Sequence, residues 1–374
     1  MATRELLDQL VGLGFSCTAV TASIFDPNHQ VSIDEMVSQF NPSGTFRRDL
    51  PEDPSLVEIS CNGMTHTILK TGRSQRSFLS PQEEEALLTL VGRKITDFHP
   101  DLLLTYGGLP AERKIHRLAH QREVPVVFYL HNGLYRNAET FSDVDLILVP
   151  SKFIADFYSQ KLGIRSSVLH PFFKTDPYLA NDRNPRFVTF INPVPEKGLT
   201  LFARIVAEAL QQLPEAEFLV IEGRWAQADV ARTGLKLDRI PNVKVIPRQG
   251  DMRTVYRETR ILLHPSFGVE AFGRTIIEAQ LNGIPVMAGR RGGIPEALND
   301  GGFLFDIPDR CTKKYMAIPS PEEVQPWIET LQILLQDQEA YDEAQTRALR
   351  AAKDFSPEKI VRRAIDLFNE LLDK

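Results

Sequence analysis

Short apolar segments alternate with helix-length segments along most of this chain, and this alternation constrains the fold more than any other feature. Short apolar strands separated by helices of about 10 to 15 residues are typical of parallel βα units whose sheet is covered on both faces. The pattern therefore predicts an α/β protein built from Rossmann-like units. In the second half the expected strands cover residues 187–191, 217–221, 243–246, 261–264 and 285–288.

The first half follows the same pattern around a small antiparallel insert. Asn62-Gly63 separates the apolar segments 55–61 and 64–71, and this dipeptide supplies the two positive φ angles of a type I′ hairpin. Ser80-Pro81 is typical of a helix start. We expect helices over 4–13, 81–98 and 111–122 and from Ser151 onward, and strands over 15–21, 101–106, 124–131 and 144–149.

The 374-residue length exceeds the size at which one hydrophobic core usually stops growing, so it favours two domains. Residues 173–186 are rich in Pro, Asn and Asp, which suits a hinge. We therefore expect a first domain over 1–173, a second domain over 174–355, and a terminal helix over 356–374. Ligands of such sheets bind beyond the carboxyl ends of the strands, in a cleft between the two domains.

Composition excludes several classes of protein. The net charge is −6, from 43 basic and 49 acidic residues, and no long basic block points to nucleic acid. Charged residues interrupt the leucines of segment 1–10, so it lacks the apolar core of a signal peptide. No apolar run approaches the roughly 18 residues of a membrane helix. Three cysteines without a CxxC spacing argue against disulfides and zinc, and a cytoplasmic location fits best.

The strongest chemical pattern lies in residues 264–278, where a strand, a short loop, a glycine and a helix start follow one another. Glu270 falls in the loop and Glu278 about two turns along the helix, so both can face one ligand. First-turn amides lack intrahelical acceptors and the helix dipole is positive there, which favours a diphosphate. Carboxylates beside it can accept hydrogen bonds from sugar and ribose hydroxyls. The expected binding residues of this segment are Glu270, Ala271, Phe272, Gly273, Arg274, Thr275 and Glu278.

Together with segments 279–286 and 292–296, this pattern closely resembles the retaining family 4 glycosyltransferases, which have two Rossmann-like domains facing a cleft (the GT-B fold). The resemblance implies that Glu270 contacts the donor sugar and that Glu278 binds the nucleotide ribose. It also implies that domain 1–173 lies on the acceptor side, that domain 174–355 binds the nucleotide sugar, and that the terminal helix 356–374 crosses back to the first domain. The resemblance covers nearly the whole chain; residues that match the family are frequent over 187–296 and fewer before residue 124.

The resemblance extends to segment 190–198, where Lys197 matches the lysine that binds the donor phosphates in this family. Asn192 stands where the family usually has an arginine. Arg224 or Arg274 is therefore expected to supply the second phosphate cation. Ile246-Pro247-Arg248 resembles the segment whose backbone contacts the nucleotide base, which places Ile246 and Arg248 in the binding set.

In the first domain, His131 follows an apolar strand, and the resemblance makes it a donor-sugar contact close to the reacting carbon. Tyr106-Gly107-Gly108 ends the preceding strand, either as acceptor lining or as a tight turn. His116 and His120 have a spacing that could hold zinc. No glutamate follows His116 and no third ligand is evident, so we interpret both as surface histidines and expect no metal site.

The sequence thus predicts a metal-independent hexosyltransferase with His131, Lys197 and Glu270 as catalytic residues. It needs no cofactor beyond the nucleotide-sugar co-substrate, for which we take UDP-glucose. The acceptor would be an oligosaccharide or a lipid-linked intermediate of polysaccharide or glycoconjugate synthesis. Peripheral contact of the protein with a membrane remains an open alternative. A sugar-nucleotide epimerase and a non-catalytic sugar-nucleotide-binding partner are the alternatives. The absence of a Walker loop and of a complete GxGxxG argues against kinases and dinucleotide oxidoreductases.

The start of the chain departs from the family pattern. Relatives have a strand and a glycine-rich turn before the helix that residues 4–13 match, and here no residues precede that helix to form them. We therefore expect a first domain without its first strand. The missing strand would come from residues upstream of the given start, or from another chain or segment.

Overall fold

The computed structural model describes residues 2–24, 32, 33, 35, 46–50, 52–74, 79–107, 110–172 and 174–373. The chain divides into two compact units: unit 1 consists of Met1–Val149, Tyr158–Phe173 and Val361–Lys374, and unit 2 of Pro150–Phe157 and Lys174–Ile360. Two points differ from the division that we expected. Residues 150–157 group with unit 2, and the terminal helix α14 (Pro357–Leu372) is divided between the units. The expected boundary at residue 173 lies outside the described residues.

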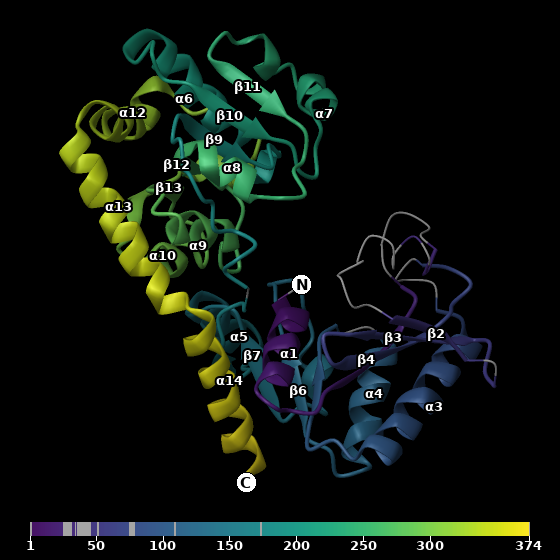
Figure 1. Cartoon of the computed structure of the whole chain (residues 1–374). Coiled ribbons are helices and arrows are strands. Elements are labelled where there is room, and N and C mark those ends of the chain that lie inside the picture. Colours follow the sequence, from purple (N-terminus) through teal and green to yellow (C-terminus); the bar gives the residue numbers. More distant parts are fainter. Residues whose placement is uncertain are drawn as a thin grey trace. The chain divides into compact units, whose positions relative to one another are not determined.

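Unit 2 is built on one sheet in which all neighbouring strands are parallel, in the order β11-β10-β9-β12-β13-β14 (Figure 1). The five strands predicted from the sequence are confirmed, and a sixth, β14, was not predicted. The strands are β9 (Phe187–Ile191), β10 (Phe218–Ile221), β11 (Val243–Ile246), β12 (Thr259–His264), β13 (Val286–Gly289) and β14 (Gly302–Phe305).

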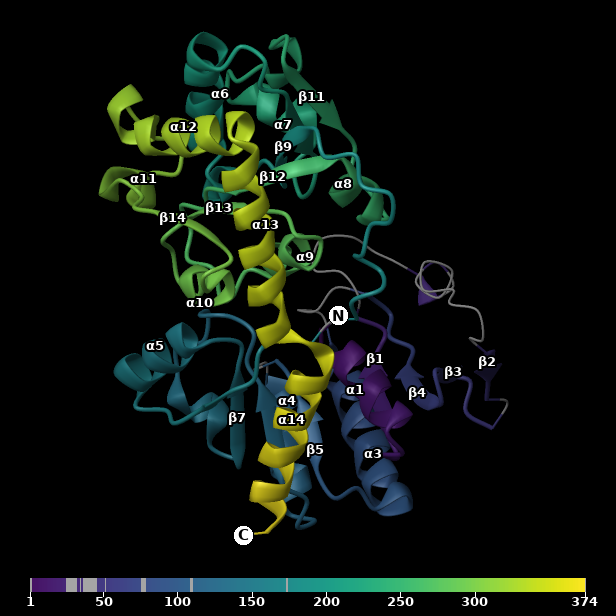
Figure 2. The ribbon, with the colours of Figure 1, turned by 60° about the vertical axis from the view of Figure 1, so that its left-hand side comes forward.

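Apolar side chains from strands and helices form the core of unit 2. The Phe190 ring of β9 stacks on Phe202 at 4.7 Å between centroids, and Phe218 of β10 meets Phe202 edge-on at 5.9 Å. Full burial of each such side chain contributes about 1.5–3 kcal/mol. The helices are α6 (Leu199–Gln212), α7 (Gln227–Arg232), α8 (Arg253–Glu258), α9 (Arg274–Leu281), α10 (Ile294–Leu298), α11 (Asp309–Lys313), α12 (Pro321–Gln336) and α13 (Gln338–Ala352). Helix α13 packs against α9, as both views show (Figures 1 and 2).

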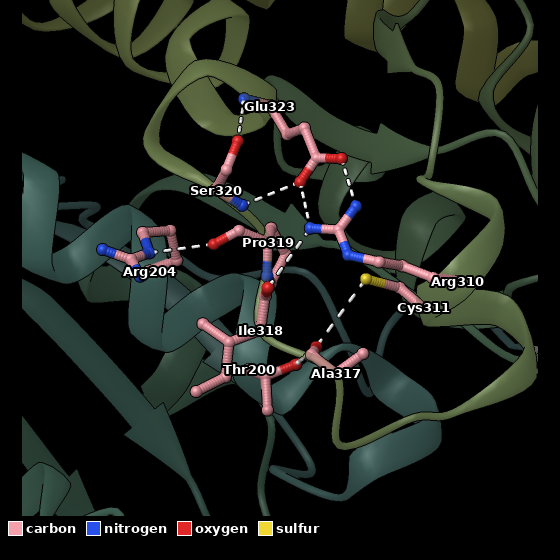
Figure 3. A network of polar contacts seen from close by, with 9 residues as sticks. All are labelled: Thr200, Arg204, Arg310, Cys311, Ala317, Ile318, Pro319, Ser320 and Glu323. Atoms are coloured by element: carbon pink, nitrogen blue, oxygen red, sulfur yellow. Dashed lines mark hydrogen bonds and ion pairs between the residues drawn. The ribbon is translucent and has the colours of Figure 1, made fainter.

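A polar network fastens the segment between α11 and α12 to α6 (Figure 3). The backbone carbonyls of residues 317–319 accept hydrogen bonds from Thr200 and Arg204 of α6 and from Arg310 of α11. Arg310 also forms a two-armed ion pair with Glu323, which begins α12 through a capping box with Ser320. These side chains satisfy three consecutive carbonyls of an otherwise irregular segment, which fixes its path.

Unit 1 contains two four-stranded sheets, ordered β1-β4-β3-β2 and β5-β6-β7-β8. The second sheet is parallel throughout. In the first sheet β1 pairs parallel with β4, and the other pairs are antiparallel. The strands are β1 (Thr18–Ala22), β2 (Phe46–Asp49), β3 (Leu56–Cys61), β4 (Met64–Leu69), β5 (Leu103–Thr105), β6 (Val126–Tyr129), β7 (Leu146–Val149) and β8 (Ser167–Val168).

The predicted hairpin is confirmed, because Asn62 has φ 51° and Gly63 has φ 75° between β3 and β4. It is not a separate insert, since β4 also pairs with β1. The helices α3 (Pro81–Phe98) and α4 (Pro110–His120) lie against each other, and one apolar core combines α3 with strands of both sheets. Helix α3 starts as predicted, with a capping box between Ser80 and Glu83.

The edges of the two sheets of unit 1 bear on the expected lack of a first strand. Among the described residues no strand joins β1 to β5, and each of these strands is paired on one side only. The first helix, α1 (Ala2–Gly12), buries Leu6 and Leu10. The lack of a first strand and the source of one both stay predictions.

Within the described part of the chain, no helix combines the length and the apolar character needed to cross a membrane.

Candidate functional site

The polar side chains of unit 2 gather where β9 and β12, adjacent strands of the sheet, come to their carboxyl ends. Lys197 ends the short helix η2 (Pro195–Lys197) that follows β9, and Glu270 lies in the loop that follows β12. The Lys197 ammonium forms a hydrogen-bonded ion pair with Glu270 Oε1. Ser266 Oγ donates to the same oxygen at 2.7 Å. Two residues predicted for catalysis thus meet, 73 positions apart in sequence.

Two glycines let the backbone approach closely enough to build this site. Gly198 has φ +85°, and a Cβ there would lie 2.1 Å from the Pro265 carbonyl oxygen. Gly292 has φ +58°, and a Cβ there would lie 2.2 Å from the Glu270 carbonyl oxygen. Both positions have a left-handed backbone and leave no space for a side chain, so each favours glycine. These approaches hold the Lys197 turn and the Glu270 loop together.

Electrostatics keep the Glu270 carboxyl ionised and a neighbouring histidine neutral. Burial works to raise the pKa of Glu270, but the Lys197 ammonium and the Ser266 hydroxyl outweigh it, and the pKa lies below its ordinary value. Burial, reinforced by Lys197, lowers the pKa of His264 to about 4. His264 Nε2 lies 3.8 Å from Glu270 Oε1. At neutral pH the site therefore holds one cation, one carboxylate and an uncharged imidazole.

Glu278 lies on α9 and is only 6% exposed. The Tyr256 hydroxyl of α8 donates to Glu278 Oε2 at 2.7 Å, and Arg274 Nε lies 3.8 Å from Oε1. Burial, with the Glu278 charge beside it, raises the pKa of Tyr256 well above its ordinary value, so the phenol remains a donor. Arg274 also donates to the Tyr178 hydroxyl at 3.1 Å. The predicted ribose carboxylate is thus held in a fixed orientation.

Asn192, at the position where the resemblance leads us to expect arginine, organises the turn after β10. Its φ is 63°, and its Oδ1 accepts the Arg224 amide at 2.8 Å. Gly223 is pressed against it, because a Cβ there would lie 2.4 Å from Asn192 Oδ1. Arg224 Nη2 lies 2.6 Å from Oε1 of Glu196, the residue directly before Lys197 in the chain. Arg224 therefore lies beside the Lys197 turn, whereas Arg274 faces Glu278.

The remaining predicted residues of unit 2 lie in the loop before α9, at the start of α9 and at the end of β11. The Ala271 carbonyl accepts Ser151 Oγ at 2.6 Å, and the Phe272 ring is buried edge-on against Phe355. Gly273, with φ 117°, precedes the start of α9, whose Thr275 lies one residue inside. At the end of β11, the Ile246 carbonyl accepts the Glu222 amide at 3.0 Å, and Arg248 is exposed.

The candidate residues of unit 1 are described by themselves. His131 Nε2 lies 3.2 Å from Thr3 Oγ1, and its ring lies 4.1 Å from that of Tyr129. Tyr106 is exposed, and Gly108 lies outside the described residues.

The interpretation of His116 as a surface histidine is wrong. His116 is buried, 2.9 Å from Thr105 Oγ1 and edge-on to Phe128, and burial lowers its pKa to about 4. His120 is exposed, as expected, and its Nε2 lies 2.8 Å from Asp145 Oδ2. Among the residues that the structure describes, no three His, Cys, Asp or Glu side chains are grouped to hold a metal ion.

Sequence reasoning gave no role to three residues of this site. His264 and Ser266 lie inside the motif that carried the resemblance, but their contacts with Glu270 depend on how the loop folds back. Tyr256 reaches Glu278 from a separate helix, and no local signal marks that contact.

The fold is that of the two-Rossmann-domain (GT-B) glycosyltransferases. The chain superposes with a TM-score of 0.72 on a glycosyltransferase from Rickettsia africae, at 15% identity over 99% of this chain and 94% of that one. It superposes with a TM-score of 0.61 on HepE from Anabaena, solved with UDP-glucose, at 18% identity over 83% of this chain and 87% of that one. The predicted fold class is confirmed.

Residues 185–337 match the family model of the glycosyl transferases group 1. Curated relatives are the D-inositol 3-phosphate glycosyltransferases of Corynebacterium kroppenstedtii, 28% identical over 189 residues, and of Mycobacterium bovis, 30% identical over 152. These matches cover 48% and 37% of this chain, and 39% and 32% of the relatives. The predicted resemblance is confirmed, and retention of anomeric configuration stays a prediction.

Proposed function

We propose that the chain is a cytoplasmic glycosyltransferase that moves a hexose from a nucleoside diphosphate sugar, UDP-glucose, to an oligosaccharide or lipid-linked acceptor. The transfer would serve polysaccharide or glycoconjugate synthesis. It would retain the anomeric configuration and need no metal ion. The family of residues 185–337 supports the reaction class. The UDP-glucose complex of HepE, a protein of similar fold, supports the choice of donor.

The observation that carries this proposal is the Lys197–Glu270 pair beside the start of α9. A bond between the anomeric carbon and a phosphate oxygen breaks, and its electron pair leaves with the diphosphate. Lys197 and the first-turn amides of α9 would neutralise that charge. The sugar passes through an oxocarbenium-like state next to Glu270. A bond from the anomeric carbon to the acceptor oxygen forms, and the proton of the acceptor hydroxyl passes to the departing diphosphate.

Other residues would bind and orient the donor. Glu278, fixed by Tyr256, would accept the ribose hydroxyls, and the backbone at Ile246 and Arg248 would contact the base. His131 would contact the donor sugar from unit 1. Arg224 and Asn192 would belong to the phosphate side of the site.

A ligand panel followed by a product assay tests the proposal. In a thermal-shift panel of UDP, GDP and ADP, UDP should raise the melting temperature most, because a ligand at 100 times its Kd stabilises by about 2.7 kcal/mol. The protein is then incubated with UDP-glucose, with and without candidate acceptors. Sugar transfer supports the proposal. Epimerised donor would favour the epimerase alternative, and binding without turnover the non-catalytic alternative.

A further inference from the structure

His264 presents a buried nitrogen to the candidate site. The residue ends β12 and is 7% exposed. Its Nδ1 lies 3.3 Å from Thr275 Oγ1 in the first turn of α9. Its Nε2 is buried without a hydrogen-bond partner among the described residues, and the nearest carboxylate oxygen is Glu270 Oε1 at 3.8 Å. Buried polar groups in folded proteins are nearly always hydrogen-bonded, so this nitrogen needs an explanation.

The surroundings of the ring decide which nitrogen carries the hydrogen. His264 is neutral at pH 7, because burial and Lys197 lower its pKa to about 4. An ionised carboxylate such as Glu270 only accepts hydrogen bonds, so a lone pair on Nε2 would face another acceptor. With the hydrogen on Nε2, the Thr275 hydroxyl donates to Nδ1 and Nε2–H points at Glu270. In this tautomer each nitrogen faces a group that it can bond, but Nε2 and Glu270 Oε1, at 3.8 Å, are still too far apart for a hydrogen bond.

Lys197 cannot neutralise Glu270 and a diphosphate equally well. In this structure its ammonium and Ser266 Oγ share Glu270 Oε1. Under the proposed function, the donor diphosphate draws the ammonium toward its own oxygens. The buried carboxylate then loses its cation at the moment when it has to hold the donor sugar. A shift of about 1 Å would bring Nε2–H within hydrogen-bond distance.

We propose that His264 is a positioning residue for Glu270, and this inference rests on the proposed function. Its Nε2–H donates a hydrogen bond to the Glu270 carboxylate when the Lys197 ammonium moves to the donor phosphates. The Thr275 hydroxyl fixes the tautomer that makes this possible. His264 therefore acts on turnover through Glu270 and leaves the binding of the bare nucleotide to Glu278.

Three substitutions at position 264 separate hydrogen bonding from packing. In H264Q the amide nitrogen can donate from the place of Nε2, in H264N the shorter amide reaches only the place of Nδ1, and H264L removes both hydrogen-bonding groups. We expect H264Q to keep turnover within about threefold of the wild type, and H264N and H264L to lose about 10- to 100-fold, the scale of a hydrogen bond to a charged group. UDP affinity should stay within about twofold in all three.

A merely structural histidine would give a different pattern. Equal losses in H264Q and H264L would overturn the proposal, and so would wild-type turnover in H264L. If H264L does not fold, T275V supplies the second test. It keeps the shape of residue 275 but removes the hydroxyl, and it should lower turnover and reduce the share of His264 that carries its hydrogen on Nε2. Wild-type turnover with an unchanged tautomer in T275V would overturn the proposal.

Nitrogen-15 NMR of the imidazole at pH 7 keeps this inference separate from the proposed function. The wild-type spectrum should show His264 with its hydrogen on Nε2, assigned by the peaks that vanish in H264Q. A hydrogen on Nδ1 would overturn the inference whatever the enzyme assay shows. If no sugar nucleotide is turned over but the Nε2–H tautomer is present, the proposed function fails and the geometry of the pair still stands.

Discussion

Replacing Lys197 with methionine should lower both stability and turnover, through different physical causes. Removing one partner of a buried ion pair costs about 3–5 kcal/mol, because the other charge stays buried and unpaired. Here the side chains of Lys197 and Glu270 are 24% and 17% exposed, and Ser266 still donates to the carboxylate. We therefore expect the free energy of unfolding to fall by about 2 kcal/mol.

Turnover should fall by about 100-fold, the scale for losing one preorganised donor at a developing charge. The double variant K197M/E270Q separates the two effects. It removes the unpaired carboxylate, so the free energy of unfolding should return to within about 1 kcal/mol of the wild type. Turnover should stay low, because the phosphate cation is still missing. Urea unfolding monitored by circular dichroism gives the stabilities, and initial rates of sugar transfer give the turnover.

The matched control is K152M, which removes the exposed pair with Asp156. Exposed pairs contribute little, so its stability should change by less than about 0.5 kcal/mol and its turnover not at all. Wild-type turnover in K197M would refute the assignment of Lys197 to the leaving diphosphate. A double variant less stable than K197M would refute the argument from an unpaired carboxylate.

Three further predictions follow from the same contacts. E278A should weaken UDP binding in calorimetry, whereas E270A should leave UDP binding nearly intact and lower turnover; equal losses of UDP affinity would contradict this division. G198A should lower the free energy of unfolding by about 2 kcal/mol or more in urea titrations, because it combines a left-handed φ with a contact 2.1 Å from a carbonyl oxygen. His116 contributes stability that is complete above its ordinary pKa of 6.5 and is lost as the pH falls toward its folded value of about 4. In H116Q the free energy of unfolding should therefore decrease less between pH 6.5 and 4 than in the wild type. The same decrease in both proteins would refute the buried neutral state of His116.

The sequence was most informative where local patterns and the fold agree. The helix after Ser80 and the strands β9 and β11 have the predicted bounds, because caps and apolar runs mark them locally. Strand β14 was missed, since it is a four-residue edge strand that begins at Gly302, after another glycine, where the composition is typical of a loop. His116 was misjudged because helical spacing shows which residues share a face, but not that this face meets Thr105 and Phe128.

The candidate site shows the same limit. Lys197, Glu270 and Glu278 could be singled out from their motifs and from the family resemblance, and the strand ends of a parallel sheet, which meet at one edge, explain why Lys197 and Glu270 lie together. Their roles stay predictions. The contacts of Tyr256 and His264 could not, because they depend on the packing of α8 and α9 and on the return of the 265–270 loop. Residues that hold other functional residues have no spacing rule of their own.

Asn192 and Arg224 together explain how the site can lack an arginine at position 192: Arg224 brings the positive charge from the neighbouring turn. In its left-handed conformation, the Asn192 side chain accepts the amide of Arg224, and the guanidinium then reaches Glu196 beside the Lys197 turn. Arg274 contacts Glu278 and Tyr178 instead, on the ribose side of the proposed site. We therefore expect R224A to lower turnover more than R274A, and R274A to weaken UDP binding more through its contact with Glu278. Because Arg224 supplies a positive charge, N192R combined with R224A should restore part of the lost turnover. Normal turnover in R224A, with R274A impaired, would instead assign the second phosphate cation to Arg274.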